Sequence, residues 1–189
     1  RALVGHLRGG LGHVNVLSSM LFAGMSGSAV ADAGGLGPVQ IRAMEKDGYD
    51  RGFSAAVTAS SATIGPIIPP SIPAVIYGAI ANVSIAAVFI GSILPGILMG
   101  LSLMALVAII SKRRNYPKGE RASLQTLASA LIAGALPVLT PVIIVAGILS
   151  GLFTPTEASA VALIYCLMIA FLVYRTLTLR RFWALCLET

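Results

Sequence analysis

Long apolar runs separated by short polar segments dominate the chain. Four of them have the length of about twenty residues that a helix needs to cross the hydrocarbon core of a bilayer. These runs are Phe53–Ala81, Ile85–Ser111, Leu127–Ser150 and Ala158–Tyr174. A fifth apolar segment, Leu11–Ile41, is too long for one ordinary span and too short for two spans with a turn. The pattern predicts an all-α polytopic membrane protein.

The composition agrees with this prediction. Of the 189 residues, 57% are hydrophobic and 11% are charged. The mean hydropathy is +0.91, a value that excludes an ordinary soluble globular domain. The chain begins at Arg1 without an initiator Met, a signal peptide or a lipidation motif, so we expect a fragment of a larger protein. Cys166 and Cys186 lack metal-binding or CxxC spacing, so neither zinc nor a disulfide framework is expected.

The Lys and Arg residues fall into four groups, and the loops Ala81–Ser84 and Ser150–Thr156 between the apolar runs contain none. The positive-inside rule therefore places the four groups in the cytoplasm and the two loops outside. This excess explains the net charge of +6 without nucleic acid as a partner. The groups are Arg1/Arg8, Arg42/Lys46/Arg51, Lys112/Arg113/Arg114/Lys118/Arg121 and Arg175/Arg180/Arg181.

Segment Leu11–Ile41 has a cationic group at each end, so both ends must lie on the same side of the membrane. A re-entrant helical hairpin, which turns near mid-depth and returns, satisfies this condition and the length. The expected turn is Ala23–Asp32, where Gly24 and Gly27 release the backbone and small residues let the two arms approach. The hydroxyls of Ser26 and Ser28 would lie at its tip. The alternative is a small-residue packing seam in one ordinary helix.

The run Phe53–Ala81 cannot be a regular helix throughout. Its four prolines lack an amide donor and clash with the carbonyl four residues back, so we expect the helix to be interrupted over Gly65–Pro73. The prolines are Pro66, Pro69, Pro70 and Pro73. The alternative is a proline kink that serves packing alone.

Unwound backbone at membrane depth persists only where it is buried in protein or lines a hydrated cavity. Na⁺ suits such a site, because freed carbonyls and the hydroxyls of Ser60, Ser61 and Thr63 are hard oxygen ligands. The half-helix that follows Ser26–Ser28 would favour an anionic group at its N-terminus instead. A hairpin followed by a broken span is the layout of one repeat of a secondary transporter.

Three segments, Gly9–Gly37, Gly48–Gly78 and Gly151–Tyr165, strongly resemble the large membrane subunit (DctM type) of tripartite ATP-independent periplasmic (TRAP) transporters. The resemblance runs through nearly the whole chain and is weakest at Lys118–Leu131. It implies an ion transporter superfamily fold, in which two inverted repeats each contain a hairpin and a broken helix. This chain would hold the first repeat and lack the second.

The resemblance further implies an Na⁺-driven, elevator-type importer of C4-dicarboxylates, sialic acid or other sugar or keto acids. It would lie in a bacterial or archaeal cytoplasmic membrane. Its partners would be a small DctQ-type membrane subunit and a periplasmic DctP-type binding protein. Na⁺ would be the coupling ion, no organic cofactor is expected, and the chain would not be an enzyme.

Carried onto this sequence, the resemblance pairs the tip Ser26–Ala29 with the loop Ser61–Pro70. The expected Na⁺ ligands are Ser26, Gly27, Ser28, Ser61, Thr63 and Gly65. The residues expected to present the solute carboxylate are Ser28, Ala29, Asp32, Pro66, Pro69 and Pro70.

The predicted organisation divides the chain into six parts. They are a hairpin with flanks (1–52), a discontinuous span (53–82), a second span (83–115), a cytoplasmic linker (116–128), a pair of spans (129–175) and an amphipathic cytoplasmic arm (176–189) that carries Trp183.

Other residues have more specific expectations. Asp32 lies in an apolar setting, where a carboxylate is expensive unless it is paired or near a cation, so a role beside the ion and a role within the hairpin both stay open. Glu157 after Thr154 is typical of a helix N-terminus, and a partner contact is the alternative. His13 has no second ligand at helical spacing, so no metal is expected there.

Two other functions compete with transport. A channel subunit could also use broken backbone to line its filter. The sequence Gly24–Gly27 matches the nucleophile pattern of rhomboid proteases, but such a protease needs a His on another helix, and both His6 and His13 precede Ser26 on the same arm.

Overall fold

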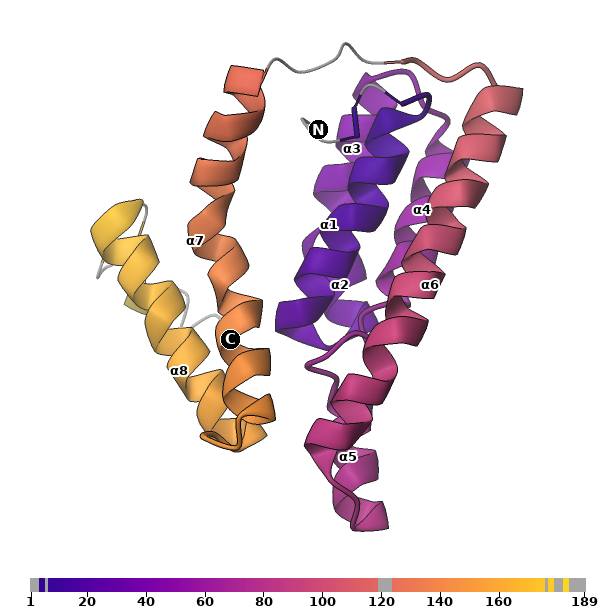
Figure 1. Cartoon of the computed structure of the whole chain (residues 1–189). Helices are drawn as coiled ribbons and strands as arrows, with labels where there is room; N and C mark the ends of the chain where they lie inside the picture. Colours follow the sequence, from indigo (N-terminus) through magenta and orange to yellow (C-terminus); the bar gives the residue numbers. More distant parts are fainter. Residues whose placement is uncertain (1–3, 6, 119–123, 176, 179–181, 184–189) are drawn as a thin grey trace. The chain divides into compact units, whose positions relative to one another are not determined.

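The computed structural model describes residues 4–5, 7–118, 124–175, 177–178 and 182–183. It divides into two compact units, Arg1–Ala133 and Gly134–Thr189, and each is described by itself. All regular elements in the described residues are helices (Figure 1). This confirms the predicted all-helical class.

The first three helices form a hairpin. Helix α1 (Gly10–Ser26) runs in one direction, and α2 (Ala29–Gly35) followed by α3 (Gly37–Lys46) returns beside it (Figure 1). Gly27 closes α1 in the left-handed conformation with φ 59°, which glycine adopts at little cost. Gly24 lies buried inside α1 and does not free the backbone as expected. The turn is therefore limited to Gly27 and Ser28.

The next apolar run is interrupted as predicted. Helix α4 (Arg51–Ala62) ends before the prolines, and α5 (Ile72–Ala81) begins after them. The loop between them is residues 63–71, as long as the expected interruption but beginning and ending two residues earlier. Pro73 lies outside it because it fits the first turn of α5, where an amide donor is not needed. Helix α6 (Ile85–Arg113) runs beside α4, the loop and α5 (Figure 1).

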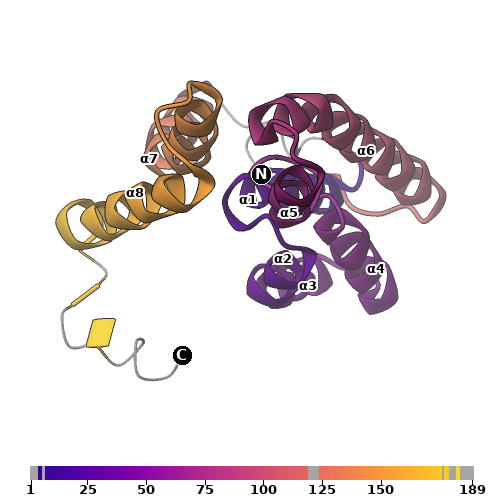
Figure 2. The ribbon, with the colours of Figure 1, turned by 90° about the horizontal axis from the view of Figure 1, so that it is seen from below.

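Helix α1 is the centre of the first unit. Seen along the helices, α1 lies between the α2–α3 arm and α6, and α4 packs against it on a third side (Figure 2). An aromatic group at one end joins the chain before α4, α4 and the chain after α6, with ring centroids of Tyr49 and Tyr116 4.6 Å apart and of Phe53 and Tyr116 5.0 Å apart. The buried apolar core of this unit is Val16, Met44, Tyr49, Phe53, Val57, Ile64 and Val107.

Two glycines of α6 allow close approach of its neighbours. A Cβ on Gly96 would lie 2.5 Å from Cγ1 of Ile68 in the loop, and one on Gly100 would lie 2.3 Å from the sulfur of Met20 on α1. Small residues at these two positions therefore let the loop and α1 pack closely against α6. At Gly91 the space is open, with no atom within 4 Å among the described residues.

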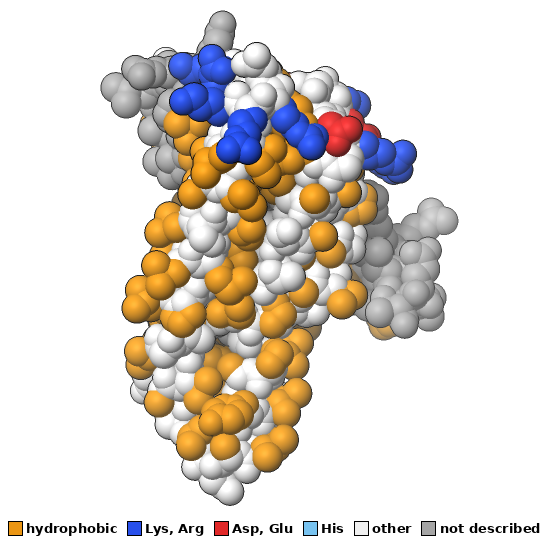
Figure 3. Space-filling model, turned by 90° about the vertical axis from the view of Figure 1, so that its right-hand side faces the viewer, with side chains coloured by type: hydrophobic (Ala, Val, Ile, Leu, Met, Phe, Trp, Pro, Cys, Tyr) orange, Lys and Arg blue, Asp and Glu red, His pale blue; other side chains and the backbone are white. Residues whose placement is uncertain are grey.

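The charges of the first unit gather at one end (Figure 3). Arg8 donates to Oδ1 of Asn115 at 3.1 Å, and Arg114 lies 3.6 Å from Oδ1 of Asp50. The start of α1, the start of α4 and the end of α6 are therefore neighbours. Such exposed pairs contribute little to stability.

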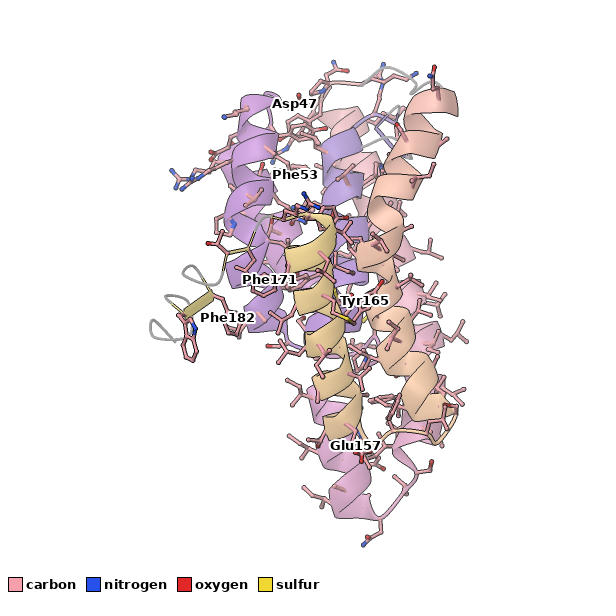
Figure 4. The ribbon with its side chains drawn as sticks, turned by 90° about the vertical axis from the view of Figure 1, so that its left-hand side faces the viewer. Asp47, Phe53, Glu157, Tyr165, Phe171 and Phe182 are labelled. Carbon is pink, nitrogen blue, oxygen red and sulfur yellow. The ribbon has the colours of Figure 1, made fainter. Side chains whose placement is uncertain are left out.

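In the second unit, α7 (Leu124–Leu149), which begins in the first unit, is followed by α8 (Pro155–Met168) and a π-helical turn (Ile169–Val173). The Tyr165 hydroxyl points from α8 to α7 and donates to the Leu136 carbonyl at 3.0 Å (Figure 4).

Glu157 lies in the first turn of α8 and completes a capping box with Thr154 (Figure 4). This confirms the helix-start interpretation of Glu157. In the described residues, two helical segments, Ile85–Arg113 and Pro155–Val173, are long and apolar enough to cross a membrane. Most of the predicted arm 176–189 lies outside the described residues, although Trp183 is seen and is 61% exposed.

Candidate ion and solute site at the hairpin tip

The hairpin tip and the loop of the broken helix are in contact. A Cβ on Gly27 would lie 2.6 Å from the carbonyl oxygen of Pro70 and 3.2 Å from the amide nitrogen of Ile72. A Cβ on Gly65 would lie 3.2 Å from the carbonyl carbon of Ser28. Each segment thus presents a glycine to the backbone of the other. At Gly27 only a residue without a side chain allows this approach, and at Gly65 a side chain would be tightly placed.

The tip holds two hydroxyls with long hydrogen bonds. The amide of Ser28 donates to the Ser26 hydroxyl at 3.4 Å, and the amide of Ala31 donates to the Ser28 hydroxyl at 3.4 Å. Both serines are half-buried. Their hydroxyl oxygens retain lone pairs that a cation or a polar ligand could use.

The loop is held together by its own contacts. Ser71 is buried, caps α5 by accepting from the Ala74 amide at 3.2 Å, and donates to the Pro66 carbonyl. The Pro69–Pro70 peptide bond is cis. Thr63 is exposed and donates to the Ser60 carbonyl at 2.7 Å.

Behind the tip, four polar side chains form a buried network between α1 and α4. The Asn15 amide donates to the Thr58 hydroxyl at 2.7 Å, and the Ser61 hydroxyl donates to Oδ1 of Asn15 at 3.1 Å. The oxygens of Ser19 and Ser61 are 3.0 Å apart. The Thr58 hydroxyl donates to the Ser54 carbonyl at 2.8 Å. We call Asn15, Ser19, Thr58 and Ser61 the α1–α4 network.

Asp32 lies in the first turn of α2 and is only 1% exposed. Neither of its carboxylate oxygens has a hydrogen-bond partner among the described residues. The Ser19 hydroxyl is a polar neighbour of the carboxylate, although the pair does not meet hydrogen-bond geometry. A buried carboxylate without a partner is unfavourable. The position therefore fits a bound cation, whose charge would compensate it.

The structure brings most of the predicted site residues to one place. Gly27, Ser28, Gly65 and Pro70 are in contact, and Ser26 and Ala29 flank the tip. Pro66 and Pro69 lie in the same loop. Two residues differ: the Ser61 hydroxyl is in the α1–α4 network, and the Thr63 side chain has its contact within its own turn.

No role was predicted from the sequence for Ser19, Thr58 and Ser71. Asn15, Ser19, Thr58 and Ser61 nevertheless form one network. Their spacing carries a signal, because Asn15 and Ser19 are four residues apart and Thr58 and Ser61 three apart. Residues at these spacings share one face of a helix. A repeated polar position on one face of an apolar helix therefore indicates a polar contact between helices.

The serine protease alternative fails on geometry for His13. Ser26 and His13 are thirteen positions apart on α1, which corresponds to about 20 Å at 1.5 Å per residue. A nucleophile and its base must lie within hydrogen-bond distance. His6 lies outside the described residues.

Comparison of the sequence with known proteins identifies its family. The family model for the DctM component of tripartite ATP-independent periplasmic transporters matches residues 1–189. The chain is 48% identical over its full length to the sialic acid TRAP transporter large permease protein SiaM of Vibrio cholerae, of which it covers 44%. It is 48% identical to the sialic acid TRAP transporter permease protein SiaT of Haemophilus influenzae, of which it covers 30%.

Over 94% of its length, the chain is also 41% identical to the C4-dicarboxylate TRAP transporter large permease protein DctM of Pseudomonas aeruginosa, of which it covers 42%. It thus spans less than half the length of these relatives. Because the family model matches every residue and the relatives align over nearly all of the chain, the chain belongs to the DctM component family of tripartite ATP-independent periplasmic transporters.

Proposed function

We propose that this chain forms one half of the membrane subunit of an Na⁺-coupled importer of small carboxylate-bearing solutes. A periplasmic binding protein delivers the solute, and a small membrane subunit completes the transporter. The relatives support this proposal, since the solutes in their names, sialic acid and C4-dicarboxylates, are carboxylates. The remaining part of the parent protein would supply the second half of the site.

The observation that carries the proposal is the contact between Gly27 and Pro70, with Asp32 buried behind the tip. Two segments with interrupted helices meet there, and their backbone groups are available to a ligand. Unwound backbone at membrane depth is tolerated where it lines such a site. The unpartnered Asp32 carboxylate favours a cation over an anion in its neighbourhood.

In this proposal Na⁺ is held by oxygens from the two segments: the hydroxyls of Ser26, Ser28 and Thr63 and the backbone near Gly27 and Gly65. Oxygen donors of this kind suit a hard cation. Asp32 supplies negative charge behind them. We assign Asp32 to the ion and not to the solute, because a buried carboxylate would repel the carboxylate of the solute.

The solute carboxylate would lie on the outer side of the tip and loop, near Ser28, Ala29, Pro66, Pro69 and Pro70. Bound Na⁺ would attract it and thus couple the two ligands. Each positive charge that enters along the membrane potential contributes about 2.3 kcal/mol per 100 mV. That energy would drive accumulation of the solute.

The experiment uses the complete subunit, reconstituted in proteoliposomes with its small subunit and binding protein. We expect uptake of radiolabelled sialic acid or C4-dicarboxylate to require an inward Na⁺ gradient and to saturate with solute. Equal uptake when K⁺ replaces Na⁺ would refute Na⁺ coupling. Unitary currents across a planar bilayer would support a channel instead.

A further inference from the structure

The α1–α4 network is fully enclosed. Asn15 and Ser19 are each 1% exposed, Thr58 is 4% exposed and Ser61 is 0% exposed. Asn15 and Ser19 lie on one face of α1, and Thr58 and Ser61 lie on the facing side of α4. A buried polar group left without its hydrogen bond is costly, so these bonds fix how the two helices sit against each other.

The donors and acceptors give the network a direction. Thr58 uses its proton on the Ser54 carbonyl, so its oxygen accepts from the Asn15 amide. The Asn15 carbonyl oxygen then faces Ser61, whose single proton goes to this oxygen or to the Thr58 carbonyl, each at 3.1 Å. With its proton in use, the Ser61 oxygen accepts from Ser19. The chain of bonds thus runs from Ser19 through Ser61 and Asn15 to Thr58.

Ser19 lies where this chain meets Asp32. Its hydroxyl has one proton, which can go to Ser61 or to the Asp32 carboxylate but not to both. A cation beside Asp32 would compete for the same carboxylate. The bonds in the network therefore depend on what the carboxylate binds.

The network also links the two segments of the proposed ion site. Helix α1 ends at the tip, one residue before Gly27, and α4 ends at Ala62, where the loop begins. Asn15 is eleven positions from Ser26, which corresponds to about 16 Å along α1. Asn15 is thus too far from the tip to contact the ion. It can act only through the relative position of α1 and α4.

We propose that the α1–α4 network is a positioning device that sets the Na⁺ affinity of the tip–loop site, with Asn15 as its central residue. It holds the tip and the loop in register and keeps Ser19 where Ser61 and Asp32 compete for its proton. Ser61 is then a positioning residue and not an ion ligand. This inference rests on the proposed Na⁺ coupling.

The test measures the Na⁺ concentration for half-maximal uptake in the complete transporter, with Asn15→Leu, Ser61→Ala and Thr58→Val. Each change removes network hydrogen bonds; Thr58→Val and Ser61→Ala do so with little change in volume, and Asn15→Leu keeps the branching of the side chain. We expect the Na⁺ requirement to rise about tenfold, equivalent to about 1.4 kcal/mol. At saturating Na⁺, the maximal rate and the half-saturating solute concentration should stay within about twofold of the parent.

Two controls separate positioning from simple packing. Ser111→Ala removes an equally buried hydroxyl that has no hydrogen-bond partner among the described residues, and it should leave the Na⁺ requirement unchanged. Thr58→Ser keeps the hydroxyl and should behave like the parent, whereas Thr58→Val should not. If Asn15→Leu fails to assemble, the Thr58 pair still gives the answer, because Thr and Val have nearly the same shape.

The outcomes are distinguishable. If the parent is Na⁺-dependent and the network variants match Ser111→Ala, the positioning role is refuted alone. A loss of maximal rate at saturating Na⁺, with an unchanged Na⁺ requirement, would also refute it, since a purely structural role predicts that result. If the parent needs no Na⁺, the proposed function fails together with this inference.

Discussion

Gly27 at the hairpin tip lies directly against Pro70 in the broken helix, so close that a Cβ on Gly27 would stand 2.6 Å from the Pro70 carbonyl oxygen. The obstacle is backbone and cannot move away as a flexible side chain could. The contact therefore depends on a residue without a side chain at this position. It also joins two segments that the sequence separates by about forty residues.

Gly27→Ala should abolish most Na⁺-dependent uptake. The left-handed backbone at φ 59° costs an alanine about 1–2 kcal/mol, and the methyl group would push the loop away. Gly48→Ala is the matched control, because Gly48 has φ 87° but no atom within 4 Å of its Cβ position among the described residues. An equal loss of uptake in the two variants would show that the strained backbone, and not the contact with Pro70, causes the defect.

Gly96→Val on α6 should reduce uptake at least several-fold, because a Cβ there would lie 2.5 Å from Ile68 and displace the loop. Gly91→Val on the same helix meets open space and should retain nearly full uptake. Both changes place a β-branched residue in α6, so their helix-propensity effects are alike. Similar losses of uptake in the two variants would contradict a role for the close contact between Gly96 and Ile68.

Asp32→Asn should lower the affinity of the subunit for Na⁺ and raise its thermal stability. The substitution removes a buried charge that has no hydrogen-bond partner among the described residues, and such a charge destabilises the fold when no cation is present. We expect the unfolding midpoint in Na⁺-free detergent solution to rise by about 2–4 °C per kcal/mol gained. A lower midpoint would mean that the carboxylate has a stabilising partner.

The capping box of α8 offers a test in the second unit. Thr154→Ala removes the hydroxyl that accepts from the Glu157 amide at 3.3 Å, and should destabilise the start of α8 by about 1 kcal/mol. Amide hydrogen exchange at Glu157 and Ala158 should accelerate about fivefold. The exposed neighbour Thr156 has no part in the cap, so Thr156→Ala should leave exchange unchanged.

The side of the membrane on which each end of α6 lies can be measured with single cysteines. Val83 precedes α6 and Asn115 follows it, and both side chains are exposed. In a variant without the native cysteines, Val83→Cys should react with an impermeant maleimide from the periplasm. Asn115→Cys should react only after the cytoplasmic face is opened. Labelling of both from one side would refute a single crossing by α6.

The sequence by itself determined which elements form. Four prolines within eight residues remove so many amide donors that no helix can continue, whereas single prolines such as Pro95 are accommodated inside α6. The cationic residues on both sides of Leu11–Ile41 required a chain that returns, and α1 to α3 do so. These outcomes follow from local backbone chemistry and from the cost of charge in lipid, which any fold of this chain must respect.

Only the tertiary structure decided where the polar side chains point. Ser61 was expected at the ion, yet its hydroxyl is committed to Asn15 and Ser19. Gly24 was expected in the turn, yet it is buried in α1, because packing offsets the small helix penalty of glycine. The apolar setting of Asp32 was visible in the sequence, but the absence of a hydrogen-bond partner for its carboxylate among the described residues was not. Such choices depend on which helix faces which, and that arrangement is set by contacts between residues far apart in the chain.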